Sequence, residues 1–292
     1  MLFERRTIRL DGGTSNGSRW TREIRSPGGG DNLYLSSIIA LDADSGRMKW
    51  YYQTTPGDNW DYTATQPLML ADIEIGGETR KVIMQAPKNG FFYVLDRMTG
   101  ELISANPFST VTWASHVDLE TGRPVETGEG EYGDRTAFVL PSANGAHNWH
   151  PMAFSPETGL VYIPTQDIAG IYSLSEQWKN EGAFTPKKNW WNTGIDWTDY
   201  IDAINALPEI PMEKGYLKAW DPATGEMKWQ AEYPAPLNGG VLATAGNLVF
   251  QGTADGFFHA YNAATGERVW SQRIQTGIVA APVTYMVDGE QY

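Results

Sequence analysis

The loop that follows Pro56 carries two carboxylates beside large aromatic rings. Asp58 and Asp61 lie three residues apart, and Trp60 and Tyr62 flank Asp61. A carboxylate next to aromatic rings is partly desolvated, and proteins use such a group as a proton acceptor or as a ligand for a hard cation. Loop aspartates also commonly close Asx turns in solvent. The spacing therefore allows a catalytic or metal-binding role without requiring one.

A predicted β-hairpin precedes this loop. Residues 39–52 are apolar, turn at Asp42-Ala43-Asp44-Ser45-Gly46, and continue with three consecutive aromatic residues. This pattern predicts two strands joined by a tight turn. Pro56-Gly57 then breaks the second strand and starts the loop.

The turn of this hairpin belongs to a repeated motif. The pattern is Ala-x-Asp/Asn-x-x-Ser/Thr-Gly-x-x-x-Trp, and three copies end at Trp50, Trp229 and Trp270. A shorter copy spans 94–100 and has Ser104 where the Trp would fall, and a looser one spans 154–159. We expect each Trp to pack against a small residue of a neighbouring copy. The turn glycines recur about every 40 to 65 residues, which predicts the blades of a β-propeller.

The composition favours an all-β chain. The 292 residues include 31 Gly, 17 Pro and 12 Trp, a combination that suits many short strands and turns. Strands are expected at 81–86, 91–95, 160–164 and 248–252, and no stretch shows a helical apolar period over three turns. Two long excursions, 109–148 and 166–215, interrupt the repeat and are expected to be functional or to contact a neighbouring subunit.

Charge and residue usage exclude several classes of partner and site. The net charge of -13 with scattered basic residues argues against nucleic acid or an anionic membrane as a partner. No apolar run approaches about 18 residues, so no membrane span is expected. The absence of cysteine excludes disulfides, thiolate metal sites and a Cys-x-x-Cys-His haem attachment within these residues. The first residues lack the apolar segment of a secretory signal.

Several longer motifs resemble those of the PQQ-dependent (quinoprotein) alcohol dehydrogenases. They are Asn16-Gly17-Ser18-x-Trp20, Arg25-Ser26-Pro27-Gly28-Gly29-Gly30-Asp31-Asn32-Leu33-Tyr34, Gly57-Asp58-Asn59-Trp60-Asp61-Tyr62, Ala86-Pro87-Lys88-Asn89-Gly90-Phe91-Phe92-Tyr93 and Ala146-His147-Asn148-Trp149-His150-Pro151-Met152. The similarity runs from about Thr14 to Tyr292, and its closing segment most resembles the quinohaemoprotein branch. The resemblance implies an eight-bladed β-propeller, present here as one partial propeller domain of about five blades over residues 1–292 with tryptophan-docking repeats.

The resemblance also implies a cofactor site. These enzymes hold pyrroloquinoline quinone (PQQ) and Ca2+ on the propeller axis. Asp61 matches the catalytic base, which also ligates calcium, and Asn16 matches a second metal ligand. Lys88 matches the residue that bonds the quinone oxygens. Asn148 and Trp149 match positions that line the cofactor pocket.

The implied reaction is the oxidation of a small alcohol to an aldehyde in the periplasm. Asp61 would take the hydroxyl proton, hydride would pass to the quinone C5, and electrons would go on to a cytochrome c. Haem c is expected only in a C-terminal domain outside these residues. Thr63 stands where the lanthanide-dependent branch has a second Asp, so the chain resembles the calcium-dependent branch.

The sequence departs from the family in two places. The family's first blades have no counterpart in this sequence. Those blades carry the glutamate calcium ligand, the paired cysteines and the groups that clamp the PQQ carboxylates, so these residues are missing as well. Residues 1–13 do not resemble the strand that should precede Asn16, and the repeat stops at 289–292. We therefore interpret the chain as a fragment and expect it to be inactive alone.

Two alternatives to the alcohol dehydrogenase remain open. One is a non-catalytic propeller scaffold of the outer-membrane assembly type, and the other is a PQQ-dependent sugar dehydrogenase with its sugar near residues 178–197. The loop motifs favour the alcohol dehydrogenase because a scaffold has no need of them. His147 and His150 could serve a zinc site, but no third ligand lies nearby, so structural roles are favoured.

Overall fold

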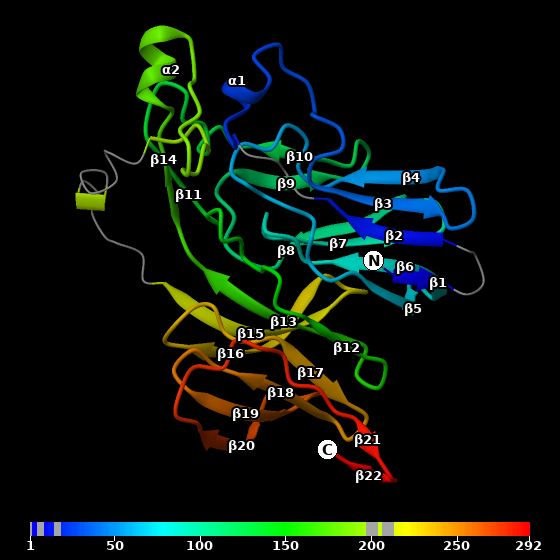
Figure 1. Ribbon diagram of the computed structural model, residues 1–292. Coiled ribbons are helices and arrows are strands. Elements are labelled where there is room, and N and C mark those ends of the chain that lie inside the picture. The colour runs from blue at the N-terminus through cyan, green and yellow to red at the C-terminus, as the bar shows by residue number, and fades with distance from the viewer. Residues whose placement is uncertain (1, 5–8, 15–18, 197–203, 206–212) are drawn as a thin grey trace. The chain divides into compact units, whose positions relative to one another are not determined.

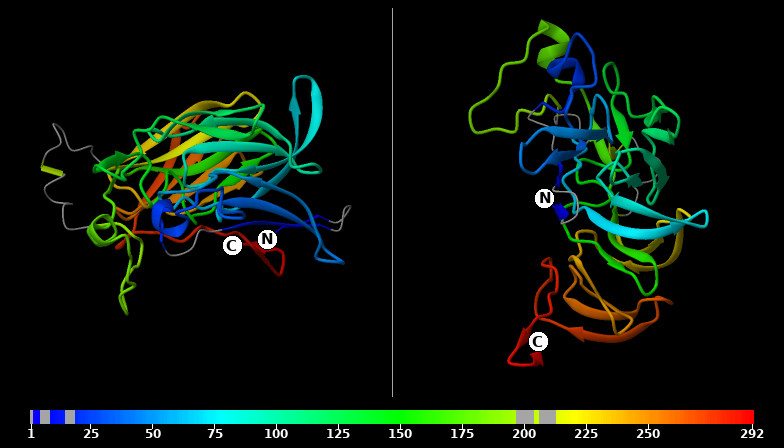
Figure 2. Two further views of the ribbon diagram at one scale, coloured as in Figure 1. Left: turned by 90° about the horizontal axis from the view of Figure 1, so that it is seen from above. Right: turned by 90° about the vertical axis from the view of Figure 1, so that its right-hand side faces the viewer.

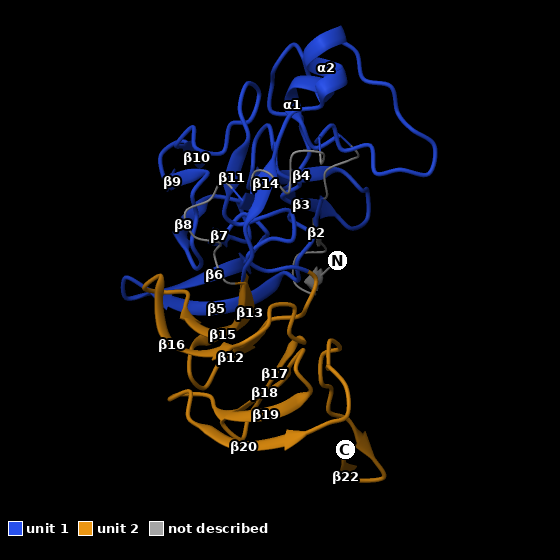
Figure 3. Ribbon diagram, turned by 90° about the vertical axis from the view of Figure 1, so that its left-hand side faces the viewer, with its two compact units in different colours: residues 1–148, 167–212 blue, residues 149–166, 213–292 orange. Residues whose placement is uncertain are grey.

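Antiparallel sheets make up nearly all of the regular structure in the computed structural model (Figures 1 and 2). The structure describes residues 2–4, 9–14, 19–196, 204–205 and 213–292. The chain divides into two compact units, one formed by residues 1–148 and 167–212 and the other by residues 149–166 and 213–292 (Figure 3).

The first unit contains two four-stranded meanders. One has the order β1 (Leu2–Glu4), β2 (Arg9–Gly13), β3 (Ser37–Asp42) and β4 (Met48–Gln53). The other has the order β5 (Met69–Ile75), β6 (Glu78–Gln85), β7 (Phe91–Asp96) and β8 (Leu102–Pro107). Two short pairs follow, β9 (Ala114–Asp118) with β10 (Arg123–Glu126), and β11 (Ala137–Val139) with β14 (Gly170–Tyr172). The helices α1 (Arg22–Arg25) and α2 (Glu176–Glu181) lie beside each other (Figures 1 and 2).

The second unit repeats the same construction. Its first sheet has the order β12 (Ala153–Ser155), β13 (Leu160–Asp167), β15 (Lys214–Asp221) and β16 (Glu226–Tyr233). Its second sheet has the order β17 (Val241–Thr244), β18 (Leu248–Gly252), β19 (Phe257–Asn262) and β20 (Arg268–Arg273). A short hairpin of β21 (Met286–Val287) and β22 (Glu290–Gln291) ends the chain.

The predicted strands are confirmed. The four expected segments fall in β6, β7, β13 and β18, and the hairpin predicted over 39–52 is β3 with β4. Residues 9–13, which do not resemble the family's strand in sequence, nevertheless form β2 and pair along β3. Within the described parts of the chain, no helix has the length and apolar character needed to cross a bilayer.

The repeated turns have one common geometry. In the first copy, Asp42 Oδ1 accepts hydrogen bonds from the backbone N–H and the hydroxyl of Ser45, at 3.0 and 2.8 Å. Gly46 has φ 68°, a left-handed value that glycine adopts most readily, and its N–H donates to the Asp42 carbonyl at 2.8 Å. The turns at 96–100, 221–225 and 262–266 share the two bonds that backbone N–H groups donate, one to Oδ1 and one to the carbonyl of the Asp or Asn. A fifth such turn, 118–122, was not recognised in the sequence.

Tryptophan docking between neighbouring copies is also confirmed. A Cβ built on Gly100 would lie 2.6 Å from Cδ2 of Trp50, and one on Gly266 would lie 2.6 Å from Cδ2 of Trp229. Real Cβ atoms do not approach so closely, so each indole rests on a bare glycine turn. Trp229 Nε1 also donates to the carbonyl of Ala263 at 2.9 Å. Within each unit, the repeat therefore joins the two four-stranded sheets through one indole.

We predict that Gly266→Ala destabilises the second unit more than Gly159→Ala. Both glycines have positive φ, 74° and 71°, so both substitutions cost about 1 kcal/mol of backbone strain. Only the methyl at 266 meets an indole, which adds about 1 to 3 kcal/mol of overpacking, whereas a Cβ at 159 meets no atom within 4 Å. Urea unfolding of the two variants measures the difference, and equal losses would contradict the docking contact.

Candidate active site

Asp61 and Lys88 form an ion pair on two loops of the first unit. Lys88 Nζ donates to Asp61 Oδ2 at 2.9 Å and to the Asp61 backbone carbonyl at 3.1 Å. The Lys88 side chain is 10% exposed and the Asp61 side chain is 19% exposed. Asp61 lies in the loop after β4, and Lys88 lies between β6 and β7. Two of the predicted site residues, 27 positions apart, are thus brought together.

The carboxylate of Asp58 shapes the turn that presents Asp61. Asp58 is fully buried, and its Oδ1 accepts the backbone N–H of Tyr62 at 2.9 Å and of Trp60 at 3.2 Å. Asp61, between these two donors, takes the left-handed conformation with φ 67°, which is uncommon for a residue with a side chain. The two aspartates therefore have different roles: Asp58 holds the backbone and Asp61 meets the lysine.

Buried aromatic side chains fasten the same loop. Trp60 Nε1 donates to the Gly130 carbonyl at 2.9 Å, Tyr62 OH donates to the Pro141 carbonyl at 2.6 Å, and Tyr172 OH donates to the Trp60 carbonyl at 3.2 Å. Burial raises the pKa of the Tyr62 and Tyr172 phenols well above the usual value, so both remain protonated donors. Trp60 also packs at 5.0 Å between ring centroids against Trp113. The loop backbone is consequently fixed from several directions.

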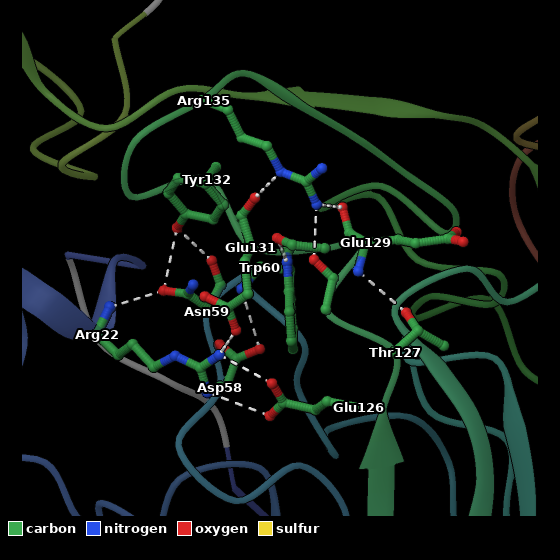
Figure 4. Close-up of polar contacts among 12 residues, drawn as sticks. Arg22, Asp58, Asn59, Trp60, Glu126, Thr127, Glu129, Glu131, Tyr132 and Arg135 are labelled. Carbon is green, nitrogen blue, oxygen red and sulfur yellow. Dashed lines mark hydrogen bonds and ion pairs between the residues drawn. The ribbon is translucent and has the colours of Figure 1, made fainter.

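A polar network anchors the side of the loop at Asn59 (Figure 4). Asn59 Oδ1 accepts the backbone N–H of Arg22 at 2.8 Å, and the Asn59 carbonyl accepts Tyr132 OH at 2.5 Å. The Arg22 guanidinium pairs with Glu126 at 2.9 Å and also with Glu131. Burial lowers the pKa of Arg22, but the hydrogen bond and charge of Glu126, together with the charge of Glu131, outweigh burial and raise it. These supporting residues were not identified from the sequence.

Arg25 holds the same loop at Asp58. Its guanidinium donates to the Asp58 carbonyl and, at 2.7 Å, to the carbonyl of Trp20. Burial lowers the pKa of Arg25, and the carboxylate of Asp58 opposes this shift. A cation and an anion therefore share one partly buried region at Asp58, three residues before Asp61.

The loop that carries Lys88 is equally constrained. A Cβ on Gly145 would lie 2.4 Å from Cγ of Lys88, so only glycine allows the lysine to pass this point. Asn89 Nδ2 donates to Tyr93 OH at 2.9 Å and to the Thr54 carbonyl at 3.1 Å. Two cavities of the first unit, of about 380 and 580 Å³, are lined by other residues and include neither Asp61 nor Lys88.

The two histidines have separate surroundings. His147 is buried and its Nδ1 bonds the Ala86 carbonyl at 2.6 Å, which supports the structural role expected for it. His150 belongs to the second unit and stacks on Trp149 with ring centroids 4.0 Å apart. In the ranges that the structure describes, no group of three or more His, Cys, Asp or Glu residues could hold a metal ion.

The other predicted site residues stay predictions. Asn148, in the first unit, donates through Nδ2 to the Asn144 carbonyl at 2.9 Å. Trp149, in the second unit, is 58% exposed. Asn16, the second predicted metal ligand, lies outside the described residues.

Comparisons with known proteins agree with the fold and the loop motifs. The family model described as PQQ, glucose/ethanol/alcohol dehydrogenase, beta-propeller domain, matches residues 21–112 and 230–292. Quinohemoprotein alcohol dehydrogenase ADH IIB of Pseudomonas putida is 54% identical over 280 residues, which are 96% of this chain and 39% of the relative. A 1-butanol dehydrogenase (cytochrome c) of Thauera butanivorans is 48% identical over 275 residues, 94% of this chain and 39% of the relative.

A solved structure extends the agreement to three dimensions. The crystal structure of quinohemoprotein alcohol dehydrogenase from Comamonas testosteroni matches with a TM-score of 0.90 and 50% identity, over 99% of this chain and 42% of that one. This likeness confirms the predicted fold class, a partial β-propeller. In the described residues, four of its blades are complete four-stranded sheets. The chain spans about two fifths of the length of the relatives it matches, 39% in both curated cases.

We predict that Asp58→Ala destabilises the first unit by about 2 to 4 kcal/mol, because two buried backbone N–H groups lose their acceptor. The matched control is Asp118→Ala, which removes the same kind of turn bond at an exposed position and should cost less. Urea unfolding followed by tryptophan fluorescence measures both. Equal losses would show that Asp58 has no special role in holding the loop.

Proposed function

Because this chain belongs to the PQQ family of glucose/ethanol/alcohol dehydrogenase β-propeller domains, we propose that it forms the catalytic part of a PQQ-dependent alcohol dehydrogenase. The observation that carries the proposal is the contact between Lys88 and Asp61, on two loops whose sequences match the family. The family match also argues against the scaffold hypothesis, since a scaffold requires no such pair. The activity of the whole protein is inferred, because the chain covers only part of its relatives.

The described residues fit one edge of PQQ. An ortho-quinone bearing acidic groups requires a cationic donor, and Lys88 supplies an ammonium that is largely shielded from water. We propose that Lys88 holds the quinone oxygens and that Asn148 and Trp149 line the cofactor pocket. The groups that would clamp the rest of the cofactor are expected outside these residues.

The fit to calcium is less complete. Calcium takes about six to eight oxygen ligands, and in the described residues no group of three or more His, Cys, Asp or Glu could hold a metal ion. Of the two predicted ligands, only Asp61 lies among the described residues. We propose that Asn16 and groups outside this chain complete the set. Thr63, in the position of the extra lanthanide-branch carboxylate, favours a divalent over a trivalent ion.

The chain's own residues would orient the substrate and move its proton. Asp61 Oδ2 accepts the hydroxyl proton of the alcohol. Before this transfer the Asp61 carboxylate is negatively charged, and the Lys88 ammonium beside it balances that charge. Lys88 Nζ also stabilises negative charge that develops on an oxygen bound beside it. PQQ, when bound, supplies the two-electron redox chemistry. The fixed loop 58–62 keeps the carboxylate in place, so little reorganisation accompanies the proton transfer.

The partners follow from the family. We propose a small alcohol as substrate and a cytochrome c as electron acceptor in the periplasm, since relatives include quinohemoproteins and a cytochrome c-linked 1-butanol dehydrogenase. Any haem c would lie in a domain outside these residues, because the chain has no cysteine to attach it.

Asp61→Asn is expected to abolish turnover without disturbing the fold. A chimera in which residues 14–292 replace the matching segment of the Comamonas testosteroni enzyme provides a complete propeller for the test. Loss of the proton acceptor should lower kcat by about 100-fold or more while PQQ absorbance and the unfolding midpoint stay unchanged. Asp44→Asn, in an exposed turn, is the control. Undiminished turnover by Asp61→Asn would remove Asp61 as the base.

The isolated 292-residue chain is expected to show no alcohol-dependent dye reduction with added PQQ and calcium. The physical reason is that, on the proposal above, the described residues would supply only one edge of the cofactor site and one metal ligand, Asp61. The chimera serves as the positive control under the same conditions. Dye reduction by the isolated chain with ethanol would contradict this expectation.

A further inference from the structure

Different partners hold the two backbone carbonyls on either side of the Asp61 α-carbon. The carbonyl of Asp61 accepts a hydrogen bond from Lys88 Nζ at 3.1 Å, so the lysine fixes the peptide group that follows the base. The carbonyl of Trp60 accepts the hydroxyl of Tyr172 at 3.2 Å. Tyr172 therefore acts on the peptide group that immediately precedes the base.

This preceding peptide group sets the backbone conformation of Asp61. Asp61 has φ 67°, a left-handed value that is unfavourable for a residue with a Cβ atom and persists only where neighbouring groups enforce it. Rotation of the peptide group between Trp60 and Asp61 would change this angle and turn the Trp60 carbonyl away. A hydrogen bond to that carbonyl resists the rotation, so Tyr172 helps to hold Asp61 in the conformation in which it meets Lys88.

The hydroxyl of Tyr172 has a hydrogen-bond partner on each side. The backbone N–H of Ala143 bonds to the phenol oxygen, and the hydroxyl itself donates to the Trp60 carbonyl. The residue is 1% exposed, so bulk water cannot replace either bond. Burial raises the pKa of the phenol well above its usual value, and the Ala143 bond opposes this shift without cancelling it. The phenol therefore stays a donor.

The segment that contains Ala143 also holds Lys88. The N–H of Ala146 donates to the Lys88 carbonyl at 3.0 Å. A Cβ on Gly145 would lie 2.4 Å from Cγ of Lys88, so the lysine stem lies directly against this segment. Through Ala143 and the Trp60 carbonyl, the hydroxyl of Tyr172 thus connects the segment beside the lysine with the loop of the base.

The ring of Tyr172 is itself fixed in place. A Cβ on Gly170, two residues earlier in β14, would lie 2.6 Å from Cε2 of Tyr172, so glycine leaves the space that the ring occupies. The ring stacks on Tyr132 with centroids 5.5 Å apart, and the hydroxyl of Tyr132 donates to the Asn59 carbonyl at 2.5 Å. The stacked pair consequently holds two successive carbonyls of the base loop, those of Asn59 and Trp60.

We propose that Tyr172 is a positioning residue for the base in alcohol oxidation, an inference that rests on the proposed function. Its hydroxyl bonds to the loop of Asp61 and to the segment beside Lys88, so the carboxylate and the ammonium keep one relative placement. This role requires no contact between Tyr172 and the substrate. The long excursion over 166–215 thereby contributes to the site through β14.

Tyr172→Phe in the chimera tests the proposal, because it removes the hydroxyl and keeps the ring. We expect kcat with ethanol to fall about tenfold or more while KM and PQQ absorbance stay unchanged, since positioning acts on the chemical step. The matched control is Tyr162→Phe, at a fully buried tyrosine of the second unit whose hydroxyl donates to the Ala263 carbonyl at 3.0 Å. Unchanged kcat in Tyr172→Phe, or an equal loss in both variants, would overturn the proposal.

Acetylation of Lys88 in the cofactor-free chimera provides a readout that does not depend on turnover. Lys88 Nζ bonds to Asp61 and its side chain is 10% exposed, so its reaction with acetic anhydride, followed by peptide mass spectrometry, should be slow. We expect the rate to rise about threefold or more in Tyr172→Phe, because the two loops separate more often, and to stay unchanged in Tyr162→Phe. An unchanged rate in Tyr172→Phe would contradict the positioning role.

The two readouts also separate this inference from the proposed function. If the unsubstituted chimera does not oxidise ethanol, the proposed function fails, and the acetylation rate of Lys88 alone decides whether Tyr172 holds the ion pair together. If the chimera is active and Tyr172→Phe changes neither kcat nor the acetylation rate, the proposed function stands and the positioning role is wrong.

Discussion

The site depends on the hydrogen bonds from two backbone N–H groups to the buried carboxylate of Asp58. These bonds close the loop, and Asp61 adopts a left-handed conformation within it. Arg25 supplies a neighbouring cation that offsets the cost of burying the Asp58 charge. Aromatic donors then tie the loop to other segments of the first unit. Asp61 is consequently left to interact through its side chain with Lys88 instead of with its own backbone.

The propeller scaffold and the site are related through the same repeat. Within each unit, the last turn of the second four-stranded sheet presents a bare glycine, and the preceding copy of the repeat supplies an indole that covers it. The connections between sheets are the segments in which the family motifs occur, so variation there leaves the docking contacts intact. The loops around Asp61 and Lys88 can thus be specialised for chemistry while the repeated turns carry the stability of the arrangement.

Much of this arrangement could be predicted from the sequence. Residue spacing predicts the hairpin turns and the main strands, because a two-residue side-chain period and an Asp-x-x-Thr-Gly turn are local patterns. The same spacing predicts the docking of Trp50 and Trp229. The turn at 118–122 was missed because Glu126 stands where the motif has its tryptophan. Residues 9–13 form a strand although they do not resemble the family's strand, since pairing along β3 is a tertiary effect.

The supporting network of the site could not be predicted. Arg22 and Tyr132 reach Asn59 from segments 37 and 73 residues away, and neither carries a local pattern that indicates this contact. The different roles of Asp58 and Asp61 likewise depend on burial and backbone direction, which spacing alone does not reveal.

The most direct test of the central claim is a crystal structure of the chimera with PQQ and a bound alcohol analogue. The account predicts that Asp61 Oδ2 lies within hydrogen-bonding distance of the alcohol oxygen and that Lys88 Nζ contacts a quinone oxygen. An Asp61 side chain directed away from both ligands, with the loop 58–62 otherwise unchanged, would contradict it.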